Sequence, residues 1–244
     1  MQYYISEDRN IEFVVTENIT KDFNLHNHIN HYVITAVVKG SALLIYNNVK
    51  VVVNEGDVFV MRPYMPHSVQ INDQSQLLSL CIKKEILITN DCDTICQLID
   101  SKFNTIADKI NLNADLKDKF YDAVKFINNT ISNERYILSS DIQKIADKII
   151  EKSEEEFSLD DLSSEVYVSK YHLIRKFKAK IGLTPHQFLI QVRVRKAQQS
   201  IAEGNRLIDA AIDNGFYDSS HFNKCFDKIV GTTPSDFEQN NNII

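Results

Sequence analysis

Histidines near the start of the sequence have a spacing that is suited to metal binding. His26 and His28 are separated by one residue, His31 follows soon after, and His67 comes later in the chain. Neutral imidazoles on facing strands, together with a carboxylate, suit iron, manganese or zinc. No Asp or Glu lies between residues 27 and 54. A metal ion would therefore depend on His26, His28 and His67 alone.

A pocket without metal is the favoured interpretation of these histidines. In such a pocket, imidazoles and tyrosines contact an organic effector or one another. A three-histidine metal site is the second alternative, and a rim of surface histidines is the third. The expected pocket residues are His26, His28, Tyr32, Tyr46 and His67.

The sequence gives little support for a redox site, a disulfide framework, a catalytic nucleophile or a phosphate-binding loop. Cys92 and Cys96 lie four residues apart and could share a helix face, but two thiols alone are a weak metal or redox signal, and ordinary buried thiols are favoured. Four cysteines are too few for a disulfide framework. No nucleophile is paired with a base, and no Gly-rich phosphate loop is present. We therefore expect a protein that is not an enzyme and that needs no cofactor.

The charge distribution indicates a polyanion as partner, although the net charge of the chain is -6. Residues 166–202 contain no Asp or Glu, and eight basic residues give this segment a local charge of +8. A basic block inside an acidic protein is typical of nucleic-acid binding. A solvated helix face is the alternative, but such faces usually carry both signs. The eight basic residues are Lys170, Arg175, Lys176, Lys178, Lys180, Arg193, Arg195 and Lys196.

The basic block overlaps the first copy of an internal repeat. The stretch KIGLTPHQF from Lys180 returns as IVGTTPSDF, and a shift of 49 residues aligns Gly182 with Gly231 and Phe177 with Phe226. Each copy contains a short apolar helix, a tight turn and a second helix, which is the pattern of a helix-turn-helix. A connecting helix between the copies would hold the two second helices where they can enter successive major grooves, about 34 Å apart.

Capping residues support these helix boundaries. Ser169 and Asp218 are predicted to cap the second helix of each copy, and Gly182 and Gly231 are predicted to end it in the left-handed conformation. Thr184 and Thr233 each precede a proline, which suits the first position of a helix.

The elements that carry these residues change along the chain. From about residue 23 to 82, short β-branched and aromatic segments predict a small sandwich or barrel. After about residue 86, helical periods begin; Phe120, Val124 and Ile127 form one stripe, and Asn113 and Ser140 are predicted N-caps. These helices pack on the β-domain or form a dimer interface. The polar stretch EKSEEEFS, residues 151–158, is the predicted domain boundary.

Bulk composition fits a folded protein of two unequal domains. The chain has 244 residues, of which 43% are hydrophobic and 25% charged, values that are close to the average for soluble globular proteins. No apolar run approaches the 18 residues of a membrane span, and the N-terminus lacks the features of a signal peptide. We expect a cytoplasmic protein without membrane contact.

The C-terminal 80 or so residues resemble the AraC/XylS family of transcription regulators. The resemblance rests on RVRKA in the connecting helix, on A-x-x-x-GF ending at Phe216, and on G-x-x-P-x-x-F ending at Phe237. The N-terminal half is similar, more loosely, to the cupin-like sensor domain of that family, through His26-Asn-His28, GDVFV and PYMPH ending at His67. Tyr32 lies near the place where metal-binding cupins have a glutamate.

The resemblance implies sequence-specific binding to double-stranded promoter DNA. Arg175 is the candidate for guanine recognition and Asn223 for adenine, whereas Lys178 and Lys180 suit phosphate. Ile174, where the family often has a longer polar residue, would contact thymine methyl groups. The second copy is poor in basic residues, so the first should dominate affinity. The implied DNA-binding residues are Lys170, Tyr171, Ile174, Arg175, Lys178, Lys180, Ser219, Ser220, His221, Asn223 and Lys224.

The sequence therefore predicts an α+β multidomain protein. A cupin-like β-barrel or sandwich at residues 1–85 would bind a small-molecule effector, and a helical dimerisation or linker region would span residues 86–152. An all-α DNA-binding domain at residues 153–244 would hold two helix-turn-helix units, at about 158–180 and 206–229. The favoured function is a homodimeric transcription regulator, an activator rather than a repressor, with RNA polymerase as a candidate partner. A metal-dependent cupin enzyme, or a small-molecule binder with an accessory helical domain, is the alternative.

Overall fold

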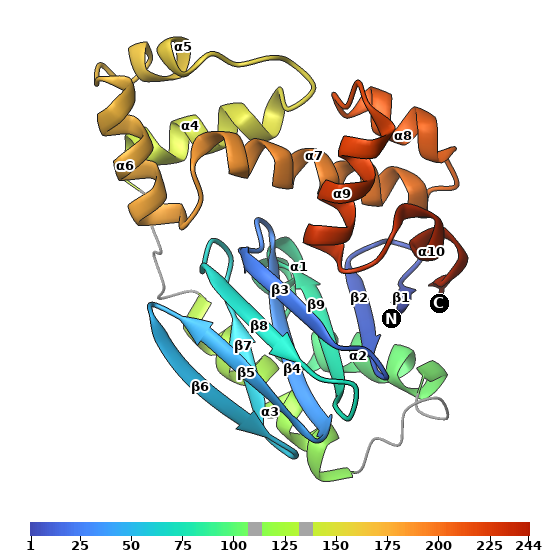
Figure 1. Ribbon diagram of the computed structural model, residues 1–244. Helices are drawn as coiled ribbons and strands as arrows, with labels where there is room; N and C mark the ends of the chain where they lie inside the picture. The colour runs from blue at the N-terminus through green and yellow to red at the C-terminus, as the bar shows by residue number, and fades with distance from the viewer. Residues whose placement is uncertain (107–113, 132–138) are drawn as a thin grey trace. The chain divides into compact units, whose positions relative to one another are not determined.

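The computed structural model describes residues 1–106, 114–131 and 139–244, which form two compact units (Figure 1). The first, here called the β-unit, comprises Met1–Asp22, His28–Arg135 and Asn240–Ile244. The second, the helical unit, comprises Phe23–Asn27 and Tyr136–Gln239. None of the helices in the described ranges combines the length and apolar character needed to cross a lipid bilayer. The predicted N-cap Asn113 lies outside the described residues.

The strands form two sheets. One has six strands in the order β10-β1-β2-β9-β4-β7, and the other has four in the order β3-β8-β5-β6. The strands are β1 Gln2–Ile5, β2 Ile11–Thr16, β3 Lys21–His26, β4 His31–Lys39, β5 Ser41–Tyr46, β6 Val49–Asn54, β7 Val58–Met61, β8 His67–Ile71, β9 Gln76–Lys83 and β10 Asn241–Ile243. Two of them, β1 and β2, precede residue 23, where the sequence predicted the strands to begin.

Alternation along β4 explains the layers of the β-unit. Tyr32 and Ile34 belong to a core beneath the helices, whereas Val33 packs with Leu44 and Met61 in a smaller cluster. Successive side chains of a strand point to opposite faces. The six-stranded sheet is therefore covered by helices on one face and by side chains of the other sheet on its second face. This arrangement agrees with the predicted sandwich.

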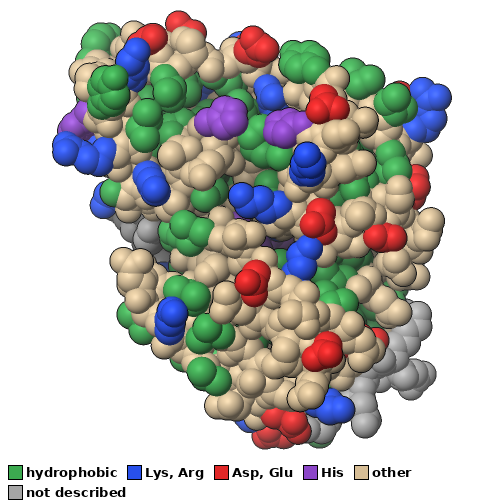
Figure 2. Space-filling view, viewed as in Figure 1, with side chains coloured by type: hydrophobic (Ala, Val, Ile, Leu, Met, Phe, Trp, Pro, Cys, Tyr) green, Lys and Arg blue, Asp and Glu red, His purple; other side chains and the backbone are tan. Residues whose placement is uncertain are grey.

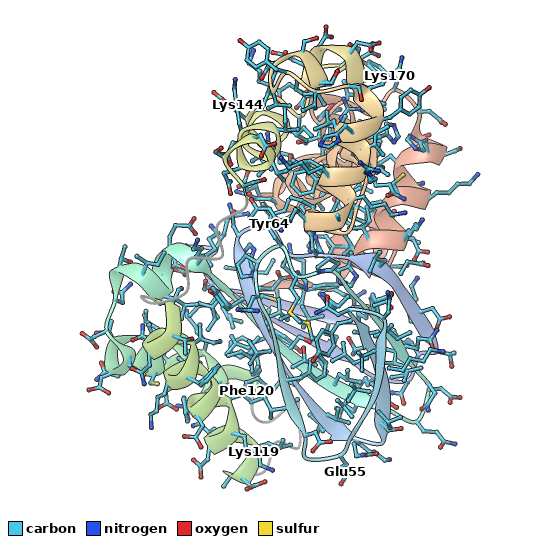
Figure 3. The ribbon with its side chains drawn as sticks, turned by 90° about the vertical axis from the view of Figure 1, so that its left-hand side faces the viewer. Glu55, Tyr64, Lys119, Phe120, Lys144 and Lys170 are labelled. Atoms are coloured by element: carbon cyan, nitrogen blue, oxygen red, sulfur yellow. The ribbon has the colours of Figure 1, made fainter. Side chains whose placement is uncertain are left out.

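Three helices cover the outer face of the six-stranded sheet: α1 Lys84–Thr89, α2 Cys92–Ile106 and α3 Ala114–Ile131. The predicted stripe on α3 is fully buried, and Figure 3 shows Phe120 directed from α3 toward the strands. The Phe103 ring lies 4.9 Å from that of Phe13 and 5.5 Å from that of Phe120. Burial of one such side chain stabilises the fold by about 1.5–3 kcal/mol. Of the two predicted roles for this stripe, it takes the packing role.

The helical unit is built around one long helix. It contains α4 Ser140–Glu151, α5 Leu159–Ser164, α6 Lys170–Ile181, α7 Pro185–Ala202, α8 Leu207–Asp213, α9 Ser219–Val230 and α10 Pro234–Gln239. The connecting helix α7 packs against α4, α6, α8, α9 and α10, and Figure 1 shows α6 and α9 beside different halves of it. The helices of residues 86–152 form no unit of their own, because α1–α3 pack on the sheet and α4 packs on α6 and α7.

The predicted caps of α6 and α9, the second helices of the two helix-turn-helix units, are present. The Ser169 hydroxyl accepts a hydrogen bond from the backbone of α6, and the Asp218 carboxylate accepts two from α9. Gly182 and Gly231 end these helices at φ values of 81° and 99°, in the left-handed region. The prediction for Ser140 was wrong by one position: α4 begins there, and the cap residue Ser139 accepts no hydrogen bond from the helix through its side chain.

Candidate nucleic-acid interface and histidine cluster

One side of α6 points away from Leu173, the first residue of its buried stripe. An α-helix turns about 100° per residue, so Tyr171, Arg175 and Lys178 project about 140–200° away from Leu173. All three are exposed, with 76% of Tyr171 accessible. We call these three residues the α6 outer face. The buried stripe consists of Leu173, Phe177 and Ile181.

The other predicted residues of α6 lie beside this face. Lys170, at the first position of the helix, approaches Asp160 to 3.6 Å, and Ile174 is half-buried on the flank. Lys180 is exposed in the last turn, but its position on the helix is about 20° from the direction of Leu173. The predicted set for the first unit is therefore split, and three of its six members share the outer face.

The corresponding face of α9 has a different composition. Ser220 and Lys224 occupy the places of Tyr171 and Arg175, while Ser219, His221 and Asn223 are exposed on its flanks. The place of Lys178 is taken by an acidic residue, Asp227, which the sequence comparison of the two copies had passed over. Residues 219–230 carry two basic side chains and one acidic one, whereas residues 170–181 carry five basic and none acidic.

Contacts within the helical unit neutralise part of the predicted basic block. Lys176 forms an ion pair with Asp141 of α4 and, by hydrogen bonding to that carboxylate, lowers the pKa of Asp141 to about 2. Lys196 lies 3.8 Å from Glu154, and Arg193 is buried. The acidic partners lie outside residues 166–202, which is why the local charge of +8 overstated the exposed positive charge.

Three cations of α6 keep their charge available. Within the described ranges, Arg175, Lys178 and Lys180 are exposed and form no ion pair. Figure 2 shows Lys and Arg side chains interspersed with Asp and Glu on the face in view, rather than a broad basic patch. The positive charge that α6 offers to a polyanion is therefore local.

An exposed tyrosine in the turn of each helix-turn-helix unit was missed by the sequence analysis. Tyr167 is 96% accessible and has a φ of 53°, and Tyr217 is 82% accessible. The left-handed region is unfavourable for a residue with a bulky side chain. The segments YVSK and GFYDS were recognised as turns, but the exposure of their aromatic residues depends on the packing of the adjacent helices.

The predicted histidine cluster is present. His26, His28 and His67 each place one ring nitrogen within 4.8 Å of the others, and His31 is not part of this group. The His28 and His67 rings lie 5.1 Å apart, centre to centre. The Nδ1 atom of His26 lies 2.7 Å from the Asn24 carbonyl oxygen, and that of His67 lies 2.9 Å from the Met65 carbonyl oxygen. A carbonyl group can only accept, so in both rings Nδ1 carries a proton and donates it to the carbonyl oxygen.

The two tyrosines of the predicted pocket lie on different faces. Tyr46 pairs directly with His67 across β5 and β8, so the two side chains share one face of the four-stranded sheet. Tyr32 instead belongs to the buried core beneath α1–α3, with 6% of its surface accessible. Because side chains alternate along β4, Val33 rather than Tyr32 faces the other sheet.

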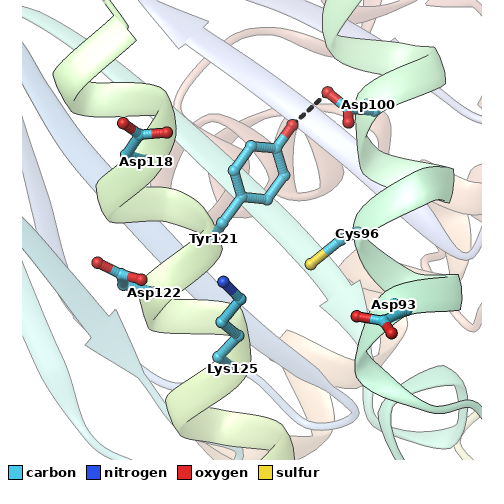
Figure 4. A pocket seen from close by; sticks show the side chains of 7 residues that line it. All are labelled: Asp93, Cys96, Asp100, Asp118, Tyr121, Asp122 and Lys125. Atoms are coloured by element: carbon cyan, nitrogen blue, oxygen red, sulfur yellow. Dashed lines mark hydrogen bonds between the residues drawn. The ribbon is translucent and has the colours of Figure 1, made fainter.

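An open acidic cleft of about 510 Å³ lies between α2 and α3 (Figure 4). Tyr121 donates a hydrogen bond to Asp100, which also pairs with Lys117 at 2.7 Å. Burial, with Cys92 nearby, raises the pKa of Cys96 to about 11. This thiol therefore stays protonated near neutral pH, which does not favour a thiolate metal site or redox pair. The lining residues are Asp93, Cys96, Asp100, Asp118, Tyr121, Asp122 and Lys125.

Comparisons with known proteins match both parts of the chain. Residues 162–240 match the family model described as a helix-turn-helix domain, and residues 10–83 match the model described as an AraC-like ligand binding domain. YbfI of Bacillus subtilis, an uncharacterized HTH-type transcriptional regulator, is 26% identical over 86% of this chain and 85% of its own length. LumQ of Photobacterium leiognathi, described as a transcriptional regulator, is 26% identical over 91% of this chain and 94% of LumQ.

Solved structures share the fold over nearly the whole chain. The crystal structure of ToxT from Vibrio cholerae covers 94% of this chain and 97% of its own, with a TM-score of 0.62 and 17% identity. Another structure, of wild-type ToxT bound to an unsaturated fatty acid, has a TM-score of 0.59 and 17% identity. The predicted fold class, with a β-rich N-terminal part and a helical C-terminal part, is confirmed.

Proposed function

Because the chain belongs to the AraC family of transcription regulators, we propose that it binds promoter DNA mainly through α6, under the control of a small molecule bound in the β-unit. The α6 outer face supports this proposal most directly. It presents Tyr171, Arg175 and Lys178 on one exposed side of a capped helix, and the second helix of a helix-turn-helix reads DNA in the major groove.

Each residue of α6 receives a role that suits its chemistry. The planar guanidinium of Arg175 can donate two hydrogen bonds to O6 and N7 of guanine. Lys178 and Lys180 contact phosphate groups, as does Lys170 at the start of the helix. Half-buried Ile174 contacts thymine methyl groups from the flank. On α9, Asn223 reads adenine, His221 meets phosphate, and the remaining contacts come from Ser219, Ser220 and Lys224.

The effector site is proposed on the face that His28, His67 and Tyr46 share with the apolar cluster between the sheets. The imidazoles and the phenol offer polar contacts, and Val33, Leu44 and Met61 offer an apolar surface. This combination suits an amphipathic organic molecule. The fatty acid bound to ToxT is one example of such chemistry on this fold, so an unsaturated fatty acid is a suitable first probe in a thermal-shift assay with His67→Ala as the matched variant.

The proposal also assigns the domains and partners. The sensor would extend from residue 1 through α3, and the DNA-binding domain would begin with α4. A homodimer is supported by apolar side chains exposed on α1–α3, among them Ile88 at 59% and Phe126 at 65% accessibility. Activation through contact with RNA polymerase, in the cytoplasm where promoter DNA is found, completes the proposed function, and we propose no catalytic step.

Binding-site selection from a pool of random DNA duplexes tests the proposed function. The wild-type protein should enrich one sequence motif, and Arg175→Ala should lower affinity for it by about 5- to 150-fold, the worth of one bidentate base contact. Arg175→Lys keeps the charge but loses the planar fork, so it should bind with reduced discrimination.

Arg206→Ala is the matched control. Arg206 is an exposed arginine of the helical unit that directly precedes α8 and pairs with Asp209 in the first turn of that helix. It should leave the selected motif and the affinity nearly unchanged. Equal losses for Arg175→Ala and Arg206→Ala would show that only net charge matters and would refute the role given to α6.

Metal binding by the histidine cluster is the second candidate function. Two of the three rings donate Nδ1–H to backbone carbonyl groups, an arrangement that orients Nε2 toward a metal ion. Tetrahedral zinc would need the three nitrogens about 3.3 Å apart, closer than the 4.8 Å within which they lie here, so binding would draw the three rings together. Elemental analysis should find zinc or iron in the wild type and none in His67→Ala; protein that is free of metal after equilibration with zinc would exclude this function.

A further inference from the structure

Arg193 is a buried cation in the middle of α7, and it bonds to three backbone carbonyl groups on two other segments of the helical unit. Its Nε donates to the Ser153 carbonyl oxygen at 2.7 Å, and Nη2 donates to that of Glu155 at 2.9 Å. Its Nη1 donates to the Gly215 carbonyl oxygen at 2.7 Å. Ser153 and Glu155 follow the end of α4, and Gly215 lies in the turn between α8 and α9.

Backbone carbonyl groups satisfy this guanidinium. Only 8% of Arg193 is accessible, and burial lowers its pKa; an arginine nevertheless stays charged in proteins. A buried charge is costly unless it is hydrogen-bonded. Here each of the three guanidinium nitrogens of Arg193 donates a hydrogen bond to a backbone carbonyl oxygen. Because the guanidinium is planar and rigid, these bonds hold the segment after α4 and the turn between α8 and α9 in one arrangement relative to α7.

The absence of a side chain at Gly215 leaves room for the Arg193 guanidinium. A Cβ atom at Gly215 would lie 2.8 Å from Cζ of Arg193 and 3.0 Å from its Nε. The next residue, Phe216, is buried, and its ring lies 5.1 Å from that of Phe222 on α9. The turn that leads into α9 is therefore held by Arg193 on one side and by the α9 core on the other.

The same helix α4 also holds the turn of the first unit. Lys148 forms an ion pair with the Glu165 side chain, and Lys144 donates to the Glu165 carbonyl oxygen at 3.3 Å. Asp141 pairs with Lys176 on α6 itself. Side chains of α4 thus reach the first unit directly, and Arg193 links the segment after α4 to the turn of the second unit.

We infer that Arg193 is a positioning residue for DNA recognition: it touches no DNA, and it sets α9 at the distance and angle from α6 that two successive major grooves require. The inference rests on the proposed function. Without the three bonds, α6 would still read its own groove, but α9 would no longer be held in place for the next one. Loss of Arg193 should therefore remove the contribution of the second groove and spare that of the first.

The test uses the full-length protein and the duplex that it selects from a random pool. A second duplex keeps the bases of the first groove and has those of the next groove scrambled. Arg193→Met should weaken binding to the intact duplex by at least about tenfold, the loss expected for one base-reading contact. It should bind the scrambled duplex as the wild type does. A mere loss of stability would lower binding to both duplexes alike, which would overturn the inference, as would unchanged binding to the intact duplex.

A pair of glycine variants tests the same contact if Arg193→Met does not fold. Gly215→Ala and Gly204→Ala place alanine at φ values of 78° and 85°, so both carry similar backbone strain. Nothing lies within 4 Å of the Cβ position at Gly204, whereas Gly215 meets Arg193. We expect Gly215→Ala alone to lose binding to the intact duplex selectively; equal behaviour of the two variants would overturn the inference.

The selection step separates the two proposals. If the wild type enriches no motif, the proposed function fails. If it enriches a motif that spans a single groove, the proposed function stands and the positioning role of Arg193 is overturned.

Discussion

Replacement of Asp141 by asparagine should weaken the helical unit near neutral pH. Asp141 lies in the first turn of α4 and pairs with Lys176 of α6. A drop of its pKa from 3.8 to about 2 corresponds to about 2.5 kcal/mol between its protonation states. The two side chains are 25% and 36% accessible, so solvent screening reduces the expected loss for Asp141→Asn to about 1 kcal/mol.

The pH dependence of this effect has a definite sign. The folded state lowers the pKa of Asp141 below its unfolded value near 3.8, so the carboxylate contributes stability above that value. The contribution is lost as the pH falls through about 2. The difference in unfolding free energy between the wild type and Asp141→Asn should therefore be full at about pH 7 and shrink steadily in acid, below about pH 4.

Asp160→Asn provides a matched control for urea unfolding followed by circular dichroism. Asp160 also lies in the first turn of a helix and faces a lysine of α6, Lys170, but at 3.6 Å and with 75% of its side chain accessible. Both variants lose the same favourable interaction with a helix N-terminus, so their difference isolates the ion pair. Equal losses for the two variants, or a loss for Asp141→Asn that persists in acid, would refute this reasoning.

Three further changes have expected outcomes. Lys178→Ala should reduce the slope of log affinity against log salt by about 0.9 in a DNA titration, while Lys196→Ala, whose lysine faces Glu154, should leave it unchanged. Phe120→Ala should destabilise the β-unit by about 3–5 kcal/mol in urea, whereas Asn129→Ala, on the exposed side of the same helix, should stay within about 0.5 kcal/mol. Ser169→Ala removes the cap of α6 and should cost about 1 kcal/mol by the same assay.

Features that depend on neighbours in sequence could be predicted. The cap at Asp218, the left-handed glycines and the buried stripe of α3 follow from a few adjacent residues, and the structure contains them. The repeat of 49 residues indicated two similar units, since both copies place the same apolar residues at helical spacing. The start of α4 was misplaced by one residue, because two serines, Ser139 and Ser140, stand next to each other at the cap.

Features that depend on distant partners could not be predicted. Arg193 was counted in the basic block, but its acceptors lie 40, 38 and 22 residues away in the chain. Lys176 was counted likewise, and its partner Asp141 is 35 residues away. The strand β10 has an Asn-rich sequence that no propensity favours, and it forms because the edge of β1 is available for pairing. In each case the partner is a matter of tertiary structure.

The two helix-turn-helix units differ in a way that assigns them different tasks. On α6 the outer face carries Arg175 and Lys178, whereas the same places on α9 hold Lys224 and Asp227. An acidic residue at that place repels phosphate, so α9 adds little to non-specific attraction and can add mainly contacts that depend on its placement. Such contacts need an orientation that is held before DNA arrives, since flexibility would cost binding free energy. The second unit has the weaker positive charge, and it is also the unit whose turn is hydrogen-bonded to Arg193 of α7, through the Gly215 carbonyl oxygen.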